Sequence, residues 1–448
     1  MNDFWFKFPL HFIIYVALML SPLSFAQEDI SDRIEKKAKL SDTKKNKKKK
    51  KKKKTGIFFG NAGLGYRWDK GRSEIRLSGF MQIDTRSFFD RGDDWSNSDL
   101  LLRRIQPSLD IKLNSTYSFH IMPSFASAPG ILDIFIDGKF SDLINLRIGK
   151  FKSPFGLERL QSATALAFNE RAFPTNLSPN REIGAQLFGD LLNRTTEYQI
   201  GLFSGAVDNS SGLRDSVIYS NHSGIDFVSR IFSHPFYHSE HSILNGLGMG
   251  IAYSYGTQQG HASGESNLPF FLSPGQQVIA AYTPGAFADG VRQRVSPQLY
   301  YHYGPLGIMS EYVISQQTIT QGNFSDKVTH DAFQVQISWV LFNGDASFRR
   351  IRPNKAIDLE TMNSWGAVQL VARYAELHLD ANAFKNNLLN PNLSTQSAND
   401  FGVGVNWYLN RNIKLQLNYD QTRFTKGAEN GVDRPDEKIL FSRLQITF

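Results

Sequence analysis

The chain has 448 residues, with 50 Lys and Arg against 42 Asp and Glu, 13% aromatic residues and no cysteine. The lack of cysteine excludes a disulfide scaffold and a zinc–thiolate site, and no apolar stretch approaches the roughly 18 residues of a membrane-spanning helix. Residues 27–55 carry 14 basic against 5 acidic side chains, so the net charge of +8 gives no evidence that the rest of the chain binds nucleic acid.

The amino terminus has the pattern of a secretory signal peptide over residues 1–26. Lys7 precedes a short apolar run at 11–20, and Ala26 ends the small-residue pattern that a signal peptidase accepts. A membrane anchor is the alternative, but the run is short for a hydrocarbon core of about 30 Å. We therefore predict that the mature chain begins at Gln27.

A lysine-rich segment follows at 27–56. It includes eight consecutive lysines, Lys47–Lys54, and has almost nothing apolar to bury. Such a density of like charge predicts a disordered periplasmic tail. The tail is either a solvated linker or a tether to anionic cell-wall polymer or lipid.

From residue 57 onward, apolar residues recur with a period of two, which is typical of strands. In 74–84 the apolar positions include Ile75 and Leu77, and the residues between them are mostly polar. The same alternation is found in the segments 247–255, 333–339 and 413–420. Strands of this kind fit a soluble sandwich with an apolar core or a membrane barrel with an apolar outer face.

Three features favour the barrel. The second face carries Arg, Gln, Asn and Asp, which suits a water-filled lumen, and the aromatic pairs at 300–301 and 407–408 suit interfacial girdles. The last segment, 440–448, alternates and ends in Phe448, as terminal strands of bacterial outer-membrane barrels do. Roughly 390 residues at about 24 per strand and loop predict about 16 strands. We predict an all-β protein, an antiparallel transmembrane β-barrel over 57–448 in the bacterial outer membrane.

The segment 145–159, Asn-Leu-Arg-Ile-Gly-Lys-Phe-Lys-Ser-Pro-Phe-Gly-Leu-Glu-Arg, resembles a motif of the phosphate-selective O and P porins. In that family the motif ends a strand and begins the loop that folds into the barrel and constricts it. The resemblance covers most of 73–448 and is weakest between 205 and 330; further matches lie at 102–104, 169–171, 180–184, 342–345 and 404–408. It implies a homotrimeric 16-stranded channel, surrounded by outer-membrane lipid, that conducts inorganic anions, phosphate or polyphosphate above all.

The resemblance also implies which side chains meet the anion. Arg159 falls at the position of an eyelet lysine, Ser162 matches an eyelet hydroxyl, and Arg171 matches an arginine later in the inward loop. The whole predicted constriction and anion-binding set is Arg103, Arg104, Asp133, Lys150, Lys152, Arg159, Ser162, Arg171, Arg350 and Lys355. Charge-assisted hydrogen bonds from such groups can replace the water shell of an anion. The alternative for each basic residue is a charge that only keeps the lumen hydrated.

The sequence departs from the phosphate-specific pattern in three places. The segment 257–278, where such members carry a run of arginines, contains no Arg or Lys. Phe80 replaces a further arginine, and the strand at 116–120 lacks an expected lysine. We therefore predict passive diffusion of small, preferentially anionic solutes rather than tight phosphate binding.

No catalytic or metal-binding motif supports an enzyme. Gly201–Gly205 misses the nucleophile-elbow spacing by one residue, and neither a P-loop nor an H-E-x-x-H motif occurs. The histidines at 234–241 could bind a metal but fit a solvated turn better, and the acidic segment 90–99 lacks EF-hand spacing. We predict no enzymatic activity, no cofactor and no metal. The alternatives left open are an adhesion or cell-wall tethering protein that works through the lysine-rich tail and, less favoured, a barrel hydrolase.

Overall fold

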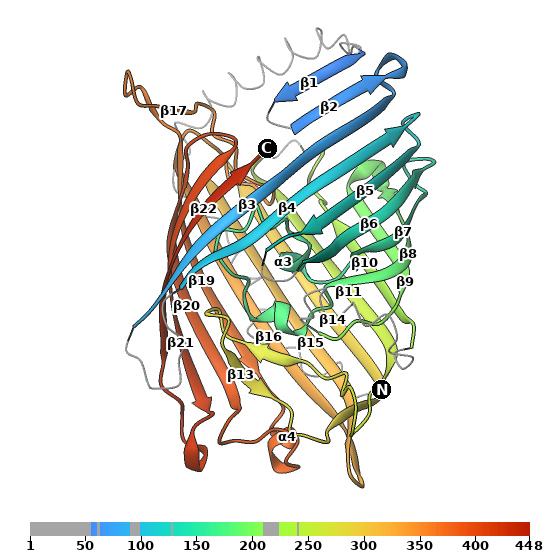
Figure 1. Ribbon diagram of the computed structural model, residues 1–448, viewed down its shortest axis with the longest axis vertical. Coiled ribbons are helices and arrows are strands. Elements are labelled where there is room, and N and C mark those ends of the chain that lie inside the picture. The colour runs from blue at the N-terminus through green and yellow to red at the C-terminus, as the bar shows by residue number, and fades with distance from the viewer. Residues whose placement is uncertain (1–54, 61–62, 90–98, 127–128, 209–223, 240–241) are drawn as a thin grey trace. The chain divides into compact units, whose positions relative to one another are not determined.

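A computed structural model describes residues 55–448 except 61–62, 90–98, 127–128, 209–223 and 240–241 (Figure 1). The predicted signal peptide, the lysines up to Lys54 and most of the acidic segment 90–99 therefore lie outside the described residues. Among the residues that are described, no helix has the length and apolar character needed to cross a membrane.

Sixteen antiparallel strands close into one barrel (Figure 1). Each strand pairs with the next one along the chain, and the last strand returns to the first, with Phe441 opposite Arg86. The predicted all-β barrel and its strand number are thus confirmed. The strands of the ring are β3 (Ser73–Phe89), β4 (Asp99–Leu113), β5 (Tyr117–Ser124), β6 (Gly130–Lys139), β7 (Asn145–Lys152), β8 (Arg181–Leu191), β9 (Thr196–Phe203), β10 (Asp226–Ser233), β11 (Leu247–Gln259), β14 (Phe287–Tyr303), β15 (Leu306–Gln321), β16 (Phe324–Phe342), β19 (Ala367–His378), β20 (Thr395–Tyr408), β21 (Ile413–Lys426) and β22 (Glu437–Thr447).

The two ends of the barrel differ in the length of their connections. At one end, which we call the turn end, most connections are short, such as 114–116, 304–305 and 409–412. Its longest connection is 343–366, with the short strands β17 (Ile357–Asp358) and β18 (Ser364–Trp365). The other end, the loop end, has the long connections 153–180, 204–225, 260–286 and 379–394. In Figure 1 the turn end is at the top.

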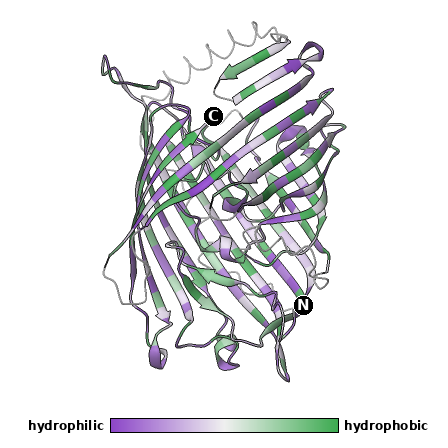
Figure 2. Ribbon diagram, in the orientation of Figure 1, coloured by the Kyte–Doolittle hydropathy of each residue, from purple (hydrophilic) through white to green (hydrophobic). Residues whose placement is uncertain are grey.

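The wall is apolar outside and polar inside, as the period of two predicts. In β16 the side chains of Ile337 and Trp339 are exposed, whereas Gln334, Gln336 and Ser338 are buried. Figure 2 shows the same alternation along the other long strands. A soluble sandwich would bury the apolar face, so the sandwich alternative is wrong.

The largest apolar cluster lies where connections from the loop end fold into the barrel. Phe155, Phe173 and Leu177 come from 153–180, which contains the helix α3 (Leu157–Leu160) and the 3-10 helix η3 (Phe173–Leu177). Phe271 and Ile279 come from 260–286, on the paired strands β12 (Phe270–Leu272) and β13 (Val278–Ala281). The connection 379–394, with α4 (Ala381–Lys385), adds Leu388. These segments narrow the lumen and pack against one another.

A hairpin lies outside the closed ring. It consists of β1 (Gly56–Gly60) and β2 (Gly63–Trp68), and the 3-10 helix η2 (Asp69–Gly71) joins it to β3. β2 pairs with Ser73–Leu77, on the same edge of β3 that pairs with β22 from Phe80 onward. The hairpin therefore continues the wall past the end of β22 at the turn end (Figure 1).

Candidate functional site

The connection 153–180, which we call the inward loop, crosses the lumen and is tied to the far wall by hydrogen bonds. Lys414 Nζ donates to the carbonyl of Leu166 at 2.8 Å, and Asn406 Nδ2 donates to that of Ala167 at 2.9 Å. A loop inside a barrel has no ladder to satisfy its backbone, so wall side chains supply the missing partners. The loop is therefore held across the lumen as the predicted constriction.

Glu170 anchors the same loop to β4. Arg103 donates from Nε and Nη2 to the two carboxylate oxygens at 2.6 and 3.0 Å, and Arg104 and Arg443 lie at 3.9 and 3.7 Å. Burial by itself would raise the pKa of Glu170, but the charges of Arg103 and Arg104 outweigh it and hold the pKa well below its ordinary value. Glu170 is thus ionised and bound by arginines.

A β-bulge explains how two adjacent arginines reach one carboxylate. Arg104 pairs with Gln82 and Leu102 pairs with Ile83, so Arg103 is an extra residue on β4. In a regular strand neighbouring side chains point to opposite faces, whereas a bulge re-aims one of them. The bulge brings both predicted arginines to the lumen side.

Two carboxylates fix the start of the inward loop. Glu311 of β15 accepts from the backbone N–H groups of Leu157 and Glu158 at 2.5 and 3.2 Å, which caps the first turn of α3. Glu158 in turn accepts from the N–H of Ala172 at 2.9 Å, and Gln334 donates to both carboxylates. Neither glutamate belongs to the predicted site, and both serve to position it.

Two predicted cations of the constriction donate to carbonyls instead of carboxylates. Lys152 Nζ donates to the carbonyls of Arg159 and Gln161 at 2.7 and 3.0 Å. Arg171 donates from Nε to Glu158 and from Nη2 to Gln161, at 3.1 and 2.9 Å. Within the described residues neither Lys152 nor Arg171 forms an ion pair. Neither side chain therefore has a carboxylate of the described residues as a direct partner.

Arg159 is buried beside these cations. Its Nη2 donates to the carbonyl of Thr175 at 2.5 Å. Burial, followed by the nearby Arg171 and Arg181 guanidinium groups, lowers the pKa of Arg159 to about 9. Ser162 lies on the same loop with its side chain exposed, and its hydroxyl contacts only Thr164, at 3.0 Å. The predicted Lys152, Arg159, Ser162 and Arg171 are thus brought together.

The other four predicted residues lie outside the inward loop. Asp133 is bound by both nitrogens of the Arg181 fork, at 2.8 and 3.1 Å. Lys150 pairs across the strands with Ile134 and Ile183, which are exposed, so it occupies an outward-facing register position. Arg350 hydrogen-bonds to Thr447 at the turn end, and Lys355 is exposed on the same connection.

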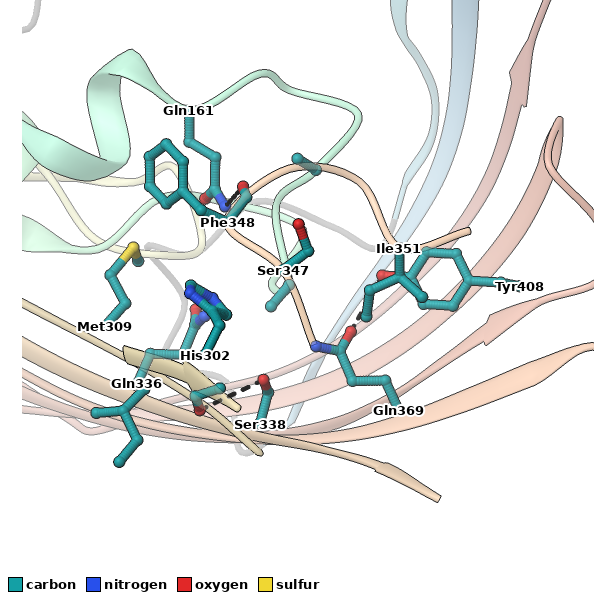
Figure 3. A pocket seen from close by; sticks show the side chains of 14 residues that line it. Gln161, His302, Met309, Gln336, Ser338, Ser347, Phe348, Ile351, Gln369 and Tyr408 are labelled. Carbon is teal, nitrogen blue, oxygen red and sulfur yellow. Dashed lines mark hydrogen bonds between the residues drawn. The ribbon is translucent and has the colours of Figure 1, made fainter. Parts of the chain in front are cut away.

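The connection 343–366, here called the turn-end insert, reaches into the barrel from the opposite side. Its Phe348 stacks on Tyr300 with ring centroids 5.0 Å apart, and the Phe348 carbonyl accepts from Gln161 Nε2 at 2.7 Å. Figure 3 shows this contact beside a cavity of about 20 Å³ that is also lined by Gln336 and Gln369. The cavity has room for about one water molecule. The inward loop and the insert therefore touch inside the lumen.

The segment 260–286 is not a wholly external loop. Its tip at 261–265 is exposed, whereas buried residues such as Phe271 and Ser273 fold inward, and Glu437 accepts from Ser273 Oγ at 2.8 Å and from the Gly275 N–H at 2.9 Å. The run 268–272, Leu-Pro-Phe-Phe-Leu, is too apolar for a solvated loop. This composition is the sequence signal that could have predicted the inward fold.

Many other charges of the lumen are paired. Arg147 binds Asp137 at 2.6 Å, Arg443 binds Asp84 at 2.6 Å, and Arg373 binds Asp420 at 2.9 Å. The histidines at 234–241 do not converge among the described residues: His234 lies 2.6 Å from Tyr300 Oη and His238 lies 3.1 Å from the Asn193 carbonyl, while 240–241 lie outside them. In the described part of the chain no group of side chains is suited to hold a metal ion.

Comparison with known proteins places the chain among membrane channels by sequence and by fold. A family model described as "Phosphate-selective porin O and P" matches residues 75–448. A comparison with curated protein sequences finds no match. Three solved structures share the fold at low sequence identity. The outer membrane channel DcaP of Acinetobacter baumannii has a TM-score of 0.56 at 11% identity, over 86% of this chain and 100% of that one. An anion-selective porin from Comamonas acidovorans has a TM-score of 0.52 at 9% identity, over 84% of this chain and 100% of that one. Pseudomonas putida OprB has a TM-score of 0.51 at 12% identity, over 84% of this chain and 94% of that one.

Proposed function

We propose that this chain conducts small, preferentially anionic solutes by passive diffusion. It belongs to the phosphate-selective porin O and P family of bacterial outer-membrane porins. The family indicates a channel rather than an enzyme. By the usual plan of such barrels, the turn end faces the periplasm and the loop end faces the outside.

The observation that carries the anion preference is the pair Lys152 and Arg171. Both side chains belong to the constriction, and both bind only backbone carbonyls. Each retains N–H groups that are not used in these contacts, because an ammonium has three and a guanidinium has five. In a narrow, poorly hydrated passage such charges favour anions over cations. The exposed Ser162 hydroxyl supplies a neutral donor on the same loop.

Paired charges keep this preference modest. Arg103 and Arg104 face Glu170, so these predicted arginines hold the loop as well as line the lumen, and the predicted Asp133 is paired with Arg181 of the wall. The connection 260–286 enters the barrel without a single Arg or Lys. Diffusion with weak selectivity therefore fits better than a tight phosphate site.

The test is the reversal potential of the reconstituted protein across a KCl gradient. Arg171→Gln should move the potential toward zero, because a unit charge about 4 Å from an ion contributes about 4 kcal/mol at an effective dielectric constant of 20, with opposite signs for an anion and a cation. Arg194→Gln is the matched control, since Arg194 is exposed at the turn end and pairs with Asp142. A potential of zero in the unaltered protein would overturn the anion preference, and current that falls on adding phosphate would reveal a phosphate site.

We also propose a homotrimer in outer-membrane lipid. The strands β5–β10, which we call the short wall, have 8 to 11 residues, whereas β15 and β16 have 16 and 19. A strand of eight residues tilted by about 45° spans roughly 19 Å, which is less than the apolar band of about 25 Å. Neighbouring copies would cover this wall. Semi-native electrophoresis and native mass determination in detergent test it, and a monomer alone would contradict it.

The lysine-rich tail at 27–56 supports a second contact with the cell envelope. We propose that it binds anionic cell-wall polymer or lipid headgroups, because clustered lysines gain about 1 kcal/mol each near an anionic surface. Removal of residues 36–54 from the mature chain should abolish salt-sensitive co-sedimentation with purified cell wall or anionic vesicles. Unchanged co-sedimentation would show that the tail is only a linker.

A further inference from the structure

The hairpin β1–β2 presents an apolar face that no other described part of the chain covers. Tyr66 pairs with Ile57 and with Ile75, and Leu64 pairs with Phe59 and with Leu77, so all six side chains share one face. We call these six residues the hairpin face. Ile57 is 79% exposed and Phe59 is 85% exposed. Large apolar side chains gathered at this exposure mark an interaction surface.

The hairpin face continues without a break into the short wall. One row of paired residues runs from Ile75 through Ile111 on β4, Phe119 on β5 and Ile136 on β6 to Ile148 on β7. Paired residues lie on the same side of a sheet. The hairpin and the strands β3–β7 therefore present one apolar surface.

The other side of the hairpin is polar and fixes its orientation. Arg67 Nε donates to Glu74 at 2.7 Å, and its guanidinium carbon lies 3.5 Å from the centroid of the Phe58 ring. The Phe58 ring in turn covers Gly65, where an added Cβ would come within 2.4 Å of the ring. These contacts hold Phe58 on this side of the hairpin, so its neighbours Ile57 and Phe59 point to the opposite, outward face.

The free edge of β1 also lacks the usual protection. Within the described residues β1 pairs only with β2, and its sequence Gly-Ile-Phe-Phe-Gly has no charge and no proline. Soluble edge strands are normally blunted by such residues because open edges pair with other chains. We therefore expect a partner to cover this uncharged edge and the apolar face beside it.

We propose that the hairpin face packs against a neighbouring copy of this chain and extends the trimer contact of the short wall to the turn end. This inference rests on the proposed trimer. A second copy is favoured over lipid because β2 occupies the edge of β3 beyond Phe448, where β22 and hence the closed ring have ended. Past the end of the ring the surroundings become aqueous, so protein is the cover that an apolar surface requires there.

The lack of cysteine allows a direct test by spin labelling. A nitroxide is attached to the cysteine of the Phe59→Cys variant of the full-length mature protein, which is then reconstituted in vesicles. The Ile57→Cys variant, labelled in the same way, provides a second reporter. We expect both labels to be shielded from oxygen, which concentrates in lipid, and from a water-soluble nickel chelate. As a second readout, the double variant Ile57→Ser, Phe59→Ser should lower the temperature at which the trimer dissociates in semi-native electrophoresis.

The matched control is the double variant Phe401→Ser, Val403→Ser on β20, which removes two exposed apolar side chains from the outer face, where Phe401 is 54% exposed. It should leave the dissociation temperature unchanged. An intact trimer whose labels are open to oxygen would show that lipid covers the hairpin, and labels open to nickel would show that water does. Either result overturns this inference and leaves the trimer standing. A monomeric parent protein overturns both.

Discussion

At the scale of single residues, the basic side chains of the lumen serve first as hydrogen-bond donors that hold the structure together. Arg103 binds Glu170, and Lys152 and Arg171 bind carbonyls of the inward loop. Burying a charged group is costly unless hydrogen bonds compensate it, so each of these contacts helps the loop to fold. A residue type typical of anion binding can therefore also hold the constriction in place.

Replacing Glu170 should release the inward loop. Glu170→Gln removes the carboxylate that Arg103 and Arg104 share, whereas Arg443 keeps Asp84, and breaking a buried ion pair costs about 3–5 kcal/mol. We expect faster hydrogen exchange in 161–171 with the barrel strands unchanged. Glu265→Gln, on an exposed loop tip, is the control. Restoration by the double variant with Arg103→Gln would confirm the pair, and equal exchange in Glu170→Gln and the parent would exclude the anchoring role.

The same ion pair predicts resistance to acid. The pKa of Glu170 in the folded protein lies below its unfolded value, which is about 4.3 for a glutamate. The stabilisation is therefore complete above that value and is lost only as the pH falls through the lower, folded pKa. Channel noise and the protection factors of the amides in 161–171, corrected for the pH dependence of intrinsic exchange, should be the same at about pH 7 and about pH 5. Release of the loop within that interval would contradict the assignment.

At the scale of elements, the sequence predicts what depends on local pattern. The period of two locates strands such as 333–339, and the motif at 145–159 locates the inward loop. The insertion of 260–286 and 343–366 depends on partners far along the chain, such as Glu437 and Tyr300, and the local signal in 268–272 does not identify those partners. The bulge at Arg103 likewise depends on how β4 pairs with β3, so the sequence of β4 alone does not predict it.

Loosening the turn-end insert should widen the passage. Phe348→Ala removes the stacking on Tyr300, worth about 0.5–1.5 kcal/mol beyond the loss of buried area. We expect a higher single-channel conductance and more frequent current fluctuations, because the insert would then leave the lumen part of the time. Leu359→Ala, in the same insert and 70% exposed, is the control. A conductance equal to that of the parent would place the insert outside the ion path.

At the scale of the whole molecule, charge is separated along the chain. The 14 basic and 5 acidic side chains of 27–55 account for the positive net charge, and the barrel that follows is close to neutral. Within it, most lumen charges are paired, so selectivity depends on the few cations at the constriction. A field from so few charges is short-ranged and easily screened.

Salt and a single added charge should therefore control the selectivity. Screening lengths fall from about 10 Å at 0.1 M salt to about 3 Å at 1 M, so the anion preference should decline over that range. Ser162→Asp places a negative charge at an exposed position of the inward loop, where only Thr164 is contacted, and should reverse the preference at low salt. Ser263→Asp, exposed at the tip of another loop, should have little effect. Reversal potentials in planar bilayers measure each variant. Equal shifts in both would mean that the mouth of the barrel sets the selectivity, whereas a shift confined to Ser162→Asp assigns it to the constriction.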